Sequence, residues 1–257
     1  MAALPLREDD VGWYLYGVVG NGAPPPAVAA VDPRHEVVVL AEGPVAGIAS
    51  RVALEEFDEA TLPERLADAA WLEQKIRAHE QVLEAALAKG AVVPCRFCTV
   101  YRDEQELRRF LSERSSALAE ALAHLEGRVE LGVKAFAAPA GSGDEASRAE
   151  SGRAYMEARA REQQAREELS RSRAEVAAQL HARLLAAAED GVVLNVQSRD
   201  VSGRDAEMLF NGAYLVGDSS RFEDAVAAAA RVHDAVELEV TGPWPPYNFV
   251  PEELGRS

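Results

Sequence analysis

Cys95 and Cys98 are the two residues in this sequence whose type and spacing come closest to a reactive site. Two thiols separated by two residues can exchange electrons as a dithiol or supply half of a zinc site. Redox pairs of this kind lie at a helix amino terminus, whereas Thr99 to Tyr101 favour a strand, in which the two sulfur atoms would point to opposite faces. A zinc site would need further ligands, and the sequence has no second cysteine pair and no close histidine pair. We therefore expect structural cysteines.

The five histidines are dispersed and match no metalloprotease or Ser/His/Asp signature. His79 falls on an apolar helical stripe beside Ile76 and Leu83, where we expect a hydrogen-bonded core histidine rather than a catalytic base. Acidic residues are so abundant that pairs of them do not indicate a carboxylate active site. We expect no enzyme, no metal and no cofactor.

The charge and the apolar pattern exclude several classes of protein. Among 257 residues, 27 are basic and 43 are acidic, so the net charge of −16 repels nucleic acid. The sequence contains no run of about 18 apolar residues, the length that a membrane-spanning helix needs, and the acidic first residues do not resemble an export signal. We therefore expect a cytoplasmic protein that neither binds nucleic acid nor inserts into a membrane.

The first half of the chain alternates strand and helix signals. Trp13 to Val19 is aromatic and β-branched and ends at a glycine and proline cluster, so it predicts a strand followed by a loop. Val37 to Leu40 and Val45 to Leu54 predict an antiparallel hairpin. Pro63 to Lys89 predicts a helix, and Ala91 to Tyr101 predicts another strand. The apolar stripe expected on the helix is Leu72, Ile76, His79, Leu83 and Leu87.

The second half follows the order β-α-β-β-α-β, which is the ferredoxin-like arrangement, and the first half has the same plan with its first helix replaced by a proline-rich loop. Asp103 and Glu106 have the spacing of a capping box at the start of a helix between the two halves. We expect an α+β protein with antiparallel sheets. The expected divisions are a modified ferredoxin-like domain over 1–102, a connecting helix over 103–127, a ferredoxin-like domain with a long helix over 128–241, and a tail over 242–257.

The long helix is expected from about Glu145 to Asp190, and its two ends differ in composition. Its second part carries a packing stripe of Leu169, Val176, Leu180 and Leu184. Its first part is highly charged, with Glu and Arg four residues apart, which is typical of a solvated arm or, alternatively, of a helix that binds a partner.

The tail contains Gly242-Pro243-Trp244-Pro245-Pro246-Tyr247-Asn248-Phe249. The prolines favour an extended backbone, and Trp244, Tyr247 and Phe249 supply large apolar faces. We expect this tail to dock onto its own domain rather than onto a partner, because a chain terminus needs to be held in place.

These motifs resemble those of the gas vesicle protein GvpF/GvpL family. The tail is similar to that family's closing signature, and Trp13 to Val19 resembles its opening strand. His79, within Ala78-His79-Glu80, and Arg96 with Phe97, within Val93 to Val100, resemble its middle motif. One departure is Cys98, which stands where the family usually has glycine. The residues that the resemblance singles out as structural or interface candidates are His79, Arg96, Phe97, Trp244, Pro245, Tyr247 and Phe249.

The resemblance implies a non-enzymatic accessory protein of gas vesicle formation, located in the cytoplasm and at the gas vesicle. Its implied partners are the major shell protein GvpA and other gas vesicle accessory proteins. Two alternatives remain at this point: a thiol or metal enzyme that uses Cys95 and Cys98, and a regulatory protein that binds a small ligand with its ferredoxin-like domains.

Overall fold

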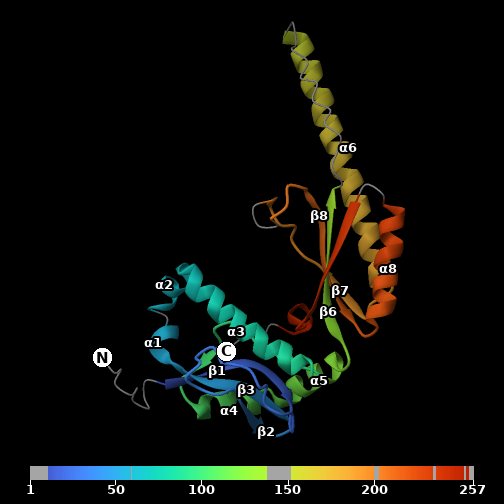
Figure 1. The fold of residues 1–257 in the computed structure, drawn as a ribbon. Helices are drawn as coiled ribbons and strands as arrows, with labels where there is room; N and C mark the ends of the chain where they lie inside the picture. Colours follow the sequence, from blue (N-terminus) through green and yellow to red (C-terminus); the bar gives the residue numbers. More distant parts are fainter. Residues whose placement is uncertain are drawn as a thin grey trace. The chain divides into compact units, whose positions relative to one another are not determined.

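The computed structural model describes residues 11–58, 60–137, 152–199, 203–233, 236–251 and 253–254. The chain divides into two compact units (Figure 1). Unit 1 comprises Met1–Val129 and Trp244–Ser257, and unit 2 comprises Glu130–Pro243. Unit 2 is therefore inserted between two segments of unit 1. Residues 103–127, which we expected to connect two domains, lie within unit 1.

Unit 1 is built on a five-stranded sheet in the order β2-β3-β1-β4, with β5 also paired to β1. All of these strands pair antiparallel, and a two-residue loop joins β2 to β3. This order is that of a ferredoxin-like sheet, and it confirms the predicted α+β plan. The strands are β1 (Val11–Gly20), β2 (Val38–Glu42), β3 (Val45–Ala53), β4 (Val93–Pro94) and β5 (Val100–Tyr101).

Helices cover both faces of this sheet (Figure 1). Tyr14 and Tyr16 of β1 face α3, whereas Leu15 faces α4, where Leu111 also contacts the β3 backbone at Gly47. Burial on both faces explains why eight consecutive residues of β1 are buried. The helices are α1 (Leu54–Phe57), α2 (Leu62–Ala67), α3 (Ala69–Leu87), α4 (Glu104–Glu113) and α5 (Ser115–Leu125).

Two helices expected to be continuous are each broken in two. Asp68 caps α3 by accepting hydrogen bonds from the next turn, so the helix predicted over 63–89 is α2 followed by α3. The helix predicted over 103–127 is α4 followed by α5, with a break at Arg114. The predicted helix cap is confirmed at Asp103, which accepts a hydrogen bond from the backbone of Glu106, whereas the Glu106 carboxylate accepts from the backbone N–H of Arg102 rather than from that of Asp103.

The predicted stripe on α3 is wrong at Ile76, which is 40% exposed, while Lys75 beside it is buried. The Lys75 ammonium group donates to the Val31 carbonyl at 2.9 Å and pairs with Glu56 at 2.8 Å. These partners satisfy the charge, so the alkyl chain of a lysine takes a place that the sequence pattern assigns to an aliphatic residue. The buried face of α3 consists of Lys75, His79, Val82, Leu83 and Ala86.

The strand predicted over 91–101 is also interrupted. Between β4 and β5 the chain forms a tight turn, in which the backbone N–H of Thr99 donates to the carbonyl of Arg96 at 3.2 Å. Cys98 is the third residue of this turn and has φ +66°, in the left-handed region that favours glycine. The regular strand from which we expected the two sulfur atoms to diverge is therefore absent at this point.

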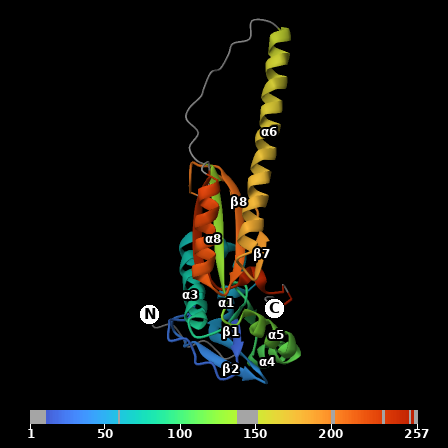
Figure 2. The same ribbon diagram turned by 90° about the vertical axis from the view of Figure 1, so that its right-hand side faces the viewer.

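Unit 2 contains a four-stranded sheet in the order β7-β8-β6-β9, with the two long helices α6 and α8 packed beside it (Figure 2). This is the order of a ferredoxin-like sheet and confirms the prediction for the second half. The elements are β6 (Val129–Ala137), α6 (Gly152–Leu185), β7 (Asp190–Val193), β8 (Met208–Val216), α8 (Ser219–Val232) and β9 (Val236–Trp244). Residues 138–151, where we predicted a chain break and the start of the long helix, lie outside the described residues.

Helix α6 has 34 residues and is about 50 Å long, and it extends beyond the other elements of unit 2 (Figure 2). The predicted packing stripe is wrong at Leu169, which is 50% exposed, whereas Leu180 and Leu184 are fully buried. The difference arises because the helix continues past the end of the sheet, so the described part of unit 2 offers the residues around Leu169 no apolar surface to pack against. Ion pairs such as Glu162 with Arg166 lie on this exposed part.

The turn at Cys98 generates a stability prediction. We expect Cys98→Gly to be more stable than Cys98→Ala by about 1 kcal/mol, because both remove the thiol and only glycine adopts the left-handed conformation without strain. The measurement is urea denaturation of both variants. At Ala117 in α5 the order should be reversed, with glycine less stable than alanine by about 1 kcal/mol. If alanine were the more stable residue at both positions, the turn would carry no left-handed strain.

Candidate functional site

The carboxyl-terminal tail is part of unit 1. After β9 ends at Trp244, Pro245 and Pro246 are buried, and Tyr247–Phe249 form a single turn of 3-10 helix, η2. Two prolines in succession limit the conformations open to the backbone before this turn. They lead the chain into the turn that carries Tyr247, whose ring packs against the core of unit 1.

Tyr247 closes a continuous chain of hydrogen bonds through the core. The backbone N–H of Cys98 donates to the Tyr14 hydroxyl at 3.1 Å, and that hydroxyl lies 2.9 Å from Nδ1 of His79. On the other side of the ring, Nε2 of His79 lies 3.0 Å from the Tyr247 hydroxyl, which donates to Glu80 at 3.0 Å. We call these five residues the tyrosine–histidine chain.

The direction of each hydrogen bond in the tyrosine–histidine chain follows from its ends. Tyr247 uses its only hydroxyl proton on Glu80, so it accepts from His79, and Nε2 therefore carries the imidazole proton. Nδ1 is then the acceptor for the Tyr14 hydroxyl, which in turn accepts from the Cys98 backbone. Each hydroxyl donates once and accepts once, and both imidazole nitrogens are occupied.

The environment keeps the histidine and the two tyrosines of this chain in their neutral forms. Burial lowers the pKa of His79 to about 4, with a backbone hydrogen bond to Cys95 acting in the opposite direction. Burial also raises the pKa of both Tyr14 and Tyr247. The pKa of Glu80 is raised by burial as well, and its hydrogen bond from Tyr247 partly offsets that effect. A neutral histidine with both nitrogens engaged holds the structure together but does not serve as a proton acceptor for a substrate.

Aromatic rings surround the imidazole of His79. The Tyr16 ring is stacked at a centroid distance of 5.8 Å, and the Phe97 ring meets the imidazole edge-on at 5.9 Å. Trp71 packs in turn against Phe97 at 6.4 Å. The turn between β4 and β5 therefore contributes both a backbone donor, through Cys98, and an aromatic wall, through Phe97.

The structure brings only some of the candidate residues together. His79, Phe97 and Tyr247 meet in the core of unit 1, and Pro245 is buried at the start of the tail. Arg96 is exposed in the turn, and Trp244 is 42% exposed. Phe249 is half-buried.

Sequence reasoning missed Tyr14 and Glu80 as members of the tyrosine–histidine chain. It also missed Tyr16, whose hydroxyl lies 2.8 Å from the Ser50 hydroxyl and accepts from the backbone of Val31 at 2.9 Å. The available signal was the pair of tyrosines two residues apart in an otherwise apolar strand, since a buried hydroxyl needs a partner.

The two thiols are poorly suited to chemistry. Cys95 is fully buried, and burial raises its pKa to about 12. Burial raises the pKa of Cys98 to about 11, although nearby Lys75 acts in the opposite direction. A thiol with such a pKa is almost entirely protonated at neutral pH, whereas the nucleophile and metal ligand is the thiolate.

The described ranges contain neither a cluster of metal ligands nor a helix suited to a membrane. Nowhere in them do three or more histidine, cysteine, aspartate or glutamate side chains gather closely enough to hold a metal ion. Within the same ranges, no helix combines the length and the apolar character that crossing a membrane requires.

Comparisons with known proteins give one consistent result. Residues 12–251 match the sequence model of the family described as "Gas vesicle synthesis protein GvpL/GvpF". The chain is 33% identical to Gas vesicle protein L of Streptomyces sp. (strain CB03234), over 91% of this chain and 88% of that protein. It is 31% identical to Gas vesicle protein F2 of Halobacterium salinarum, over 77% of this chain and 75% of that protein.

Crystal structures of two GvpF proteins share the fold. The structure from Anabaena sp. PCC7120 has a TM-score of 0.69 at 18% identity, covering 94% of this chain and 96% of that one. The structure from Microcystis aeruginosa has a TM-score of 0.66 at 20% identity, covering 93% and 99%.

The tyrosine–histidine chain predicts different costs for two tyrosine hydroxyls. Tyr247→Phe should lower the free energy of unfolding by about 1–3 kcal/mol, because it removes both the acceptor that this hydroxyl offers to His79 and the donor that it offers to Glu80. Tyr101→Phe is the matched control, since the Tyr101 hydroxyl is buried and has no partner among the described residues. Its removal should leave the free energy of unfolding unchanged or raise it, because a buried hydroxyl without a partner costs free energy in the folded state. Urea denaturation tests both variants, and equal losses would contradict the assigned role of Tyr247.

The low pKa of His79 predicts a dependence of stability on pH. Folding lowers this pKa from 6.5 to about 4, so the unfolded chain takes up the proton at a higher pH than the native protein. Neutral His79 therefore makes its full contribution to the free energy of unfolding above pH 6.5. This contribution, about 3 kcal/mol, is lost as the pH falls toward 4. The measurement is urea denaturation across this range, with His79→Asn as the reference that lacks the titration. An imidazole NMR signal of His79 that titrated near 6.5 would refute the prediction.

Proposed function

The chain belongs to the gas vesicle synthesis protein GvpL/GvpF family, and we propose that it binds the major shell protein GvpA, other gas vesicle accessory proteins, or both, to assist assembly. Its relatives are gas vesicle proteins, so the chain takes part in gas vesicle formation. The family consists of gas vesicle accessory proteins that are not known as enzymes, which agrees with the expectation of a non-enzymatic protein.

The observation that carries the proposal is the extent of the family match. It runs from residue 12 in β1 to residue 251 beyond η2, and so includes both units and the tail. The motifs that suggested the family lie at structurally demanding points of unit 1: the turn at Cys98, the buried His79 and the anchoring Tyr247. They support a role in which these residues maintain the shape of a binding protein, and the partner contacts lie elsewhere on its surface.

A physical mechanism follows from the character of the proposed partner. A shell protein that forms a gas-impermeable wall exposes apolar surface before it is incorporated. A folded partner that covers this surface lowers the concentration of the free, aggregation-prone form. The net charge of −16 supports this role, because a strongly charged partner keeps the complex in solution by electrostatic repulsion. The same proposal places the protein in the cytoplasm and at the growing vesicle.

The fold restricts where such a partner binds on unit 1. Both faces of its sheet are covered by helices, so an open sheet face is not offered there. Binding to unit 1 therefore uses the outer faces or ends of helices, loops or the edges of the sheet.

The test is co-expression of the full chain with the shell protein and the accessory proteins, followed by affinity capture over a range of salt concentrations. We expect at least one of these proteins to be retained, and deletion of the gene from a gas vesicle operon to abolish buoyant vesicles. Complementation with the intact gene should restore them. No retention at any salt concentration, together with normal vesicles after deletion, would refute the proposed function.

A further inference from the structure

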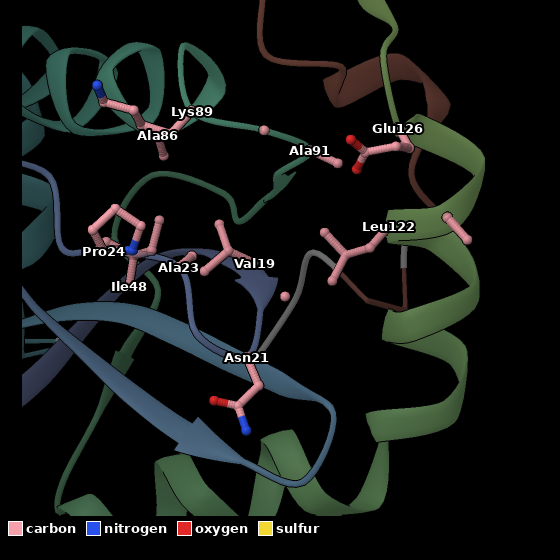
Figure 3. A pocket seen from close by; sticks show the side chains of 13 residues that line it. Val19, Asn21, Ala23, Pro24, Ile48, Ala86, Lys89, Ala91, Leu122 and Glu126 are labelled. Carbon is pink, nitrogen blue, oxygen red and sulfur yellow. The ribbon is translucent and has the colours of Figure 1, made fainter.

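A cavity of about 510 Å³ opens at one end of unit 1, where β1 ends and helices α3 and α5 both end (Figure 3). All of its lining residues belong to unit 1. The buried side chains of Val19, Ile48, Ala86 and Leu122 form its apolar floor. A volume of this size is within the range of ordinary ligand pockets.

The cavity exists because small residues line its walls. Ala23, Ala86, Ala91 and Ala123 are lining residues, and Gly20 and Gly90 add no side chains. Side chains of this size leave the space between the ends of α3 and α5 unfilled, although the surrounding core is densely packed. Entry of an apolar group of a partner into this space is favourable, because it removes apolar surface of both molecules from water.

Two opposite charges flank the mouth of the cavity. Lys89 follows the last turn of α3, and Glu126 is the residue that ends α5, so they approach the cavity from different helices (Figure 3). Both residues are exposed. Neither charged group forms an ion pair or a hydrogen bond within the described part of the chain. The third polar residue of the rim, Asn21, is already engaged, because its amide donates to the carbonyl of Gly43.

We propose that this cavity binds a short segment of a partner polypeptide, which inserts an aliphatic side chain and presents an acidic residue to Lys89 and a basic residue to Glu126. The proposal rests on the proposed function and assigns to it a specific site. Unpaired charges of both signs complement a segment that itself carries both signs, whereas a purely anionic surface would be repelled by Glu126.

The apolar floor and the charged rim have separate tasks. Burial of the inserted side chain supplies most of the affinity. Exposed ion pairs contribute little energy, but two of opposite sign fix the direction in which the segment lies across the cavity. Exchanging the two charges should therefore change which segment is accepted.

The experiment uses the full chain and, as probes, overlapping short peptides that cover the shell protein and the accessory proteins of a gas vesicle operon. Peptides that bind should carry an aliphatic residue between an acidic and a basic one. Ala91→Leu and, as a second variant, Ala123→Leu place extra side-chain volume in the cavity and should weaken binding about tenfold or more. Thermal denaturation should show that these variants remain folded.

Charge variants test the direction of the segment. Lys89→Glu and Glu126→Lys should each weaken binding about threefold to fivefold. The combined variant should prefer a peptide whose acidic and basic residues have been exchanged. Arg65→Glu and Glu64→Lys make the same changes of charge at exposed positions of α2 and should leave binding unchanged.

The outcomes separate this proposal from the proposed function. If full-length partners are retained by the intact chain and equally by the Ala91→Leu, Ala123→Leu and charge variants, the cavity is not the binding site, while the proposed function stands. If no partner is retained even by the intact chain, the proposed function itself fails. Peptides that bind without regard to the order of their charges would refute the assigned roles of Lys89 and Glu126.

Discussion

The imidazole of His79 is a polar ring placed in an apolar core, and this placement is favourable only while both of its nitrogens have partners. Those partners come from distant parts of the sequence: Tyr14 lies in the first strand and Tyr247 lies in the tail. Much of unit 1 can be understood from this requirement. The first strand, helix α3, the turn at Cys98 and the tail each contribute a group to the tyrosine–histidine chain.

This arrangement explains how a chemically suggestive set of residues can be structural. Histidine, tyrosine, glutamate and cysteine side chains gather within one core, as they do in many active sites. Here the histidine has a low pKa, both tyrosines and both thiols have raised pKa values, and each group of the chain is occupied by its neighbour. Such a core fixes the shape of unit 1, and the binding of other proteins depends on a fixed surface shape.

Local patterns in the sequence predicted much of the fold. The hairpin of β2 and β3 follows from its turn residues, and the helix cap at Asp103 is recognisable from spacing alone. Two of the errors, at Lys75 and at Cys98, share a physical cause, because each depends on a distant partner. Lys75 is buried because Glu56 and the Val31 carbonyl receive its charge, and Cys98 adopts a left-handed conformation because its turn is held against Tyr14. At the candidate site, the sequence indicated His79 and Tyr247 separately, but not the hydrogen bond between them.

The return of the tail to unit 1 has a consequence for how the protein is made. A ribosome releases unit 2 in full before it releases Tyr247, so the second unit has all of its residues available while the first still lacks the segment that begins at Trp244. Until translation ends, Nε2 of His79 has no tyrosine to donate to. The first unit to be synthesised is thus the last to be completed, and a transcript cut short near its end yields a finished second unit attached to an unfinished first one.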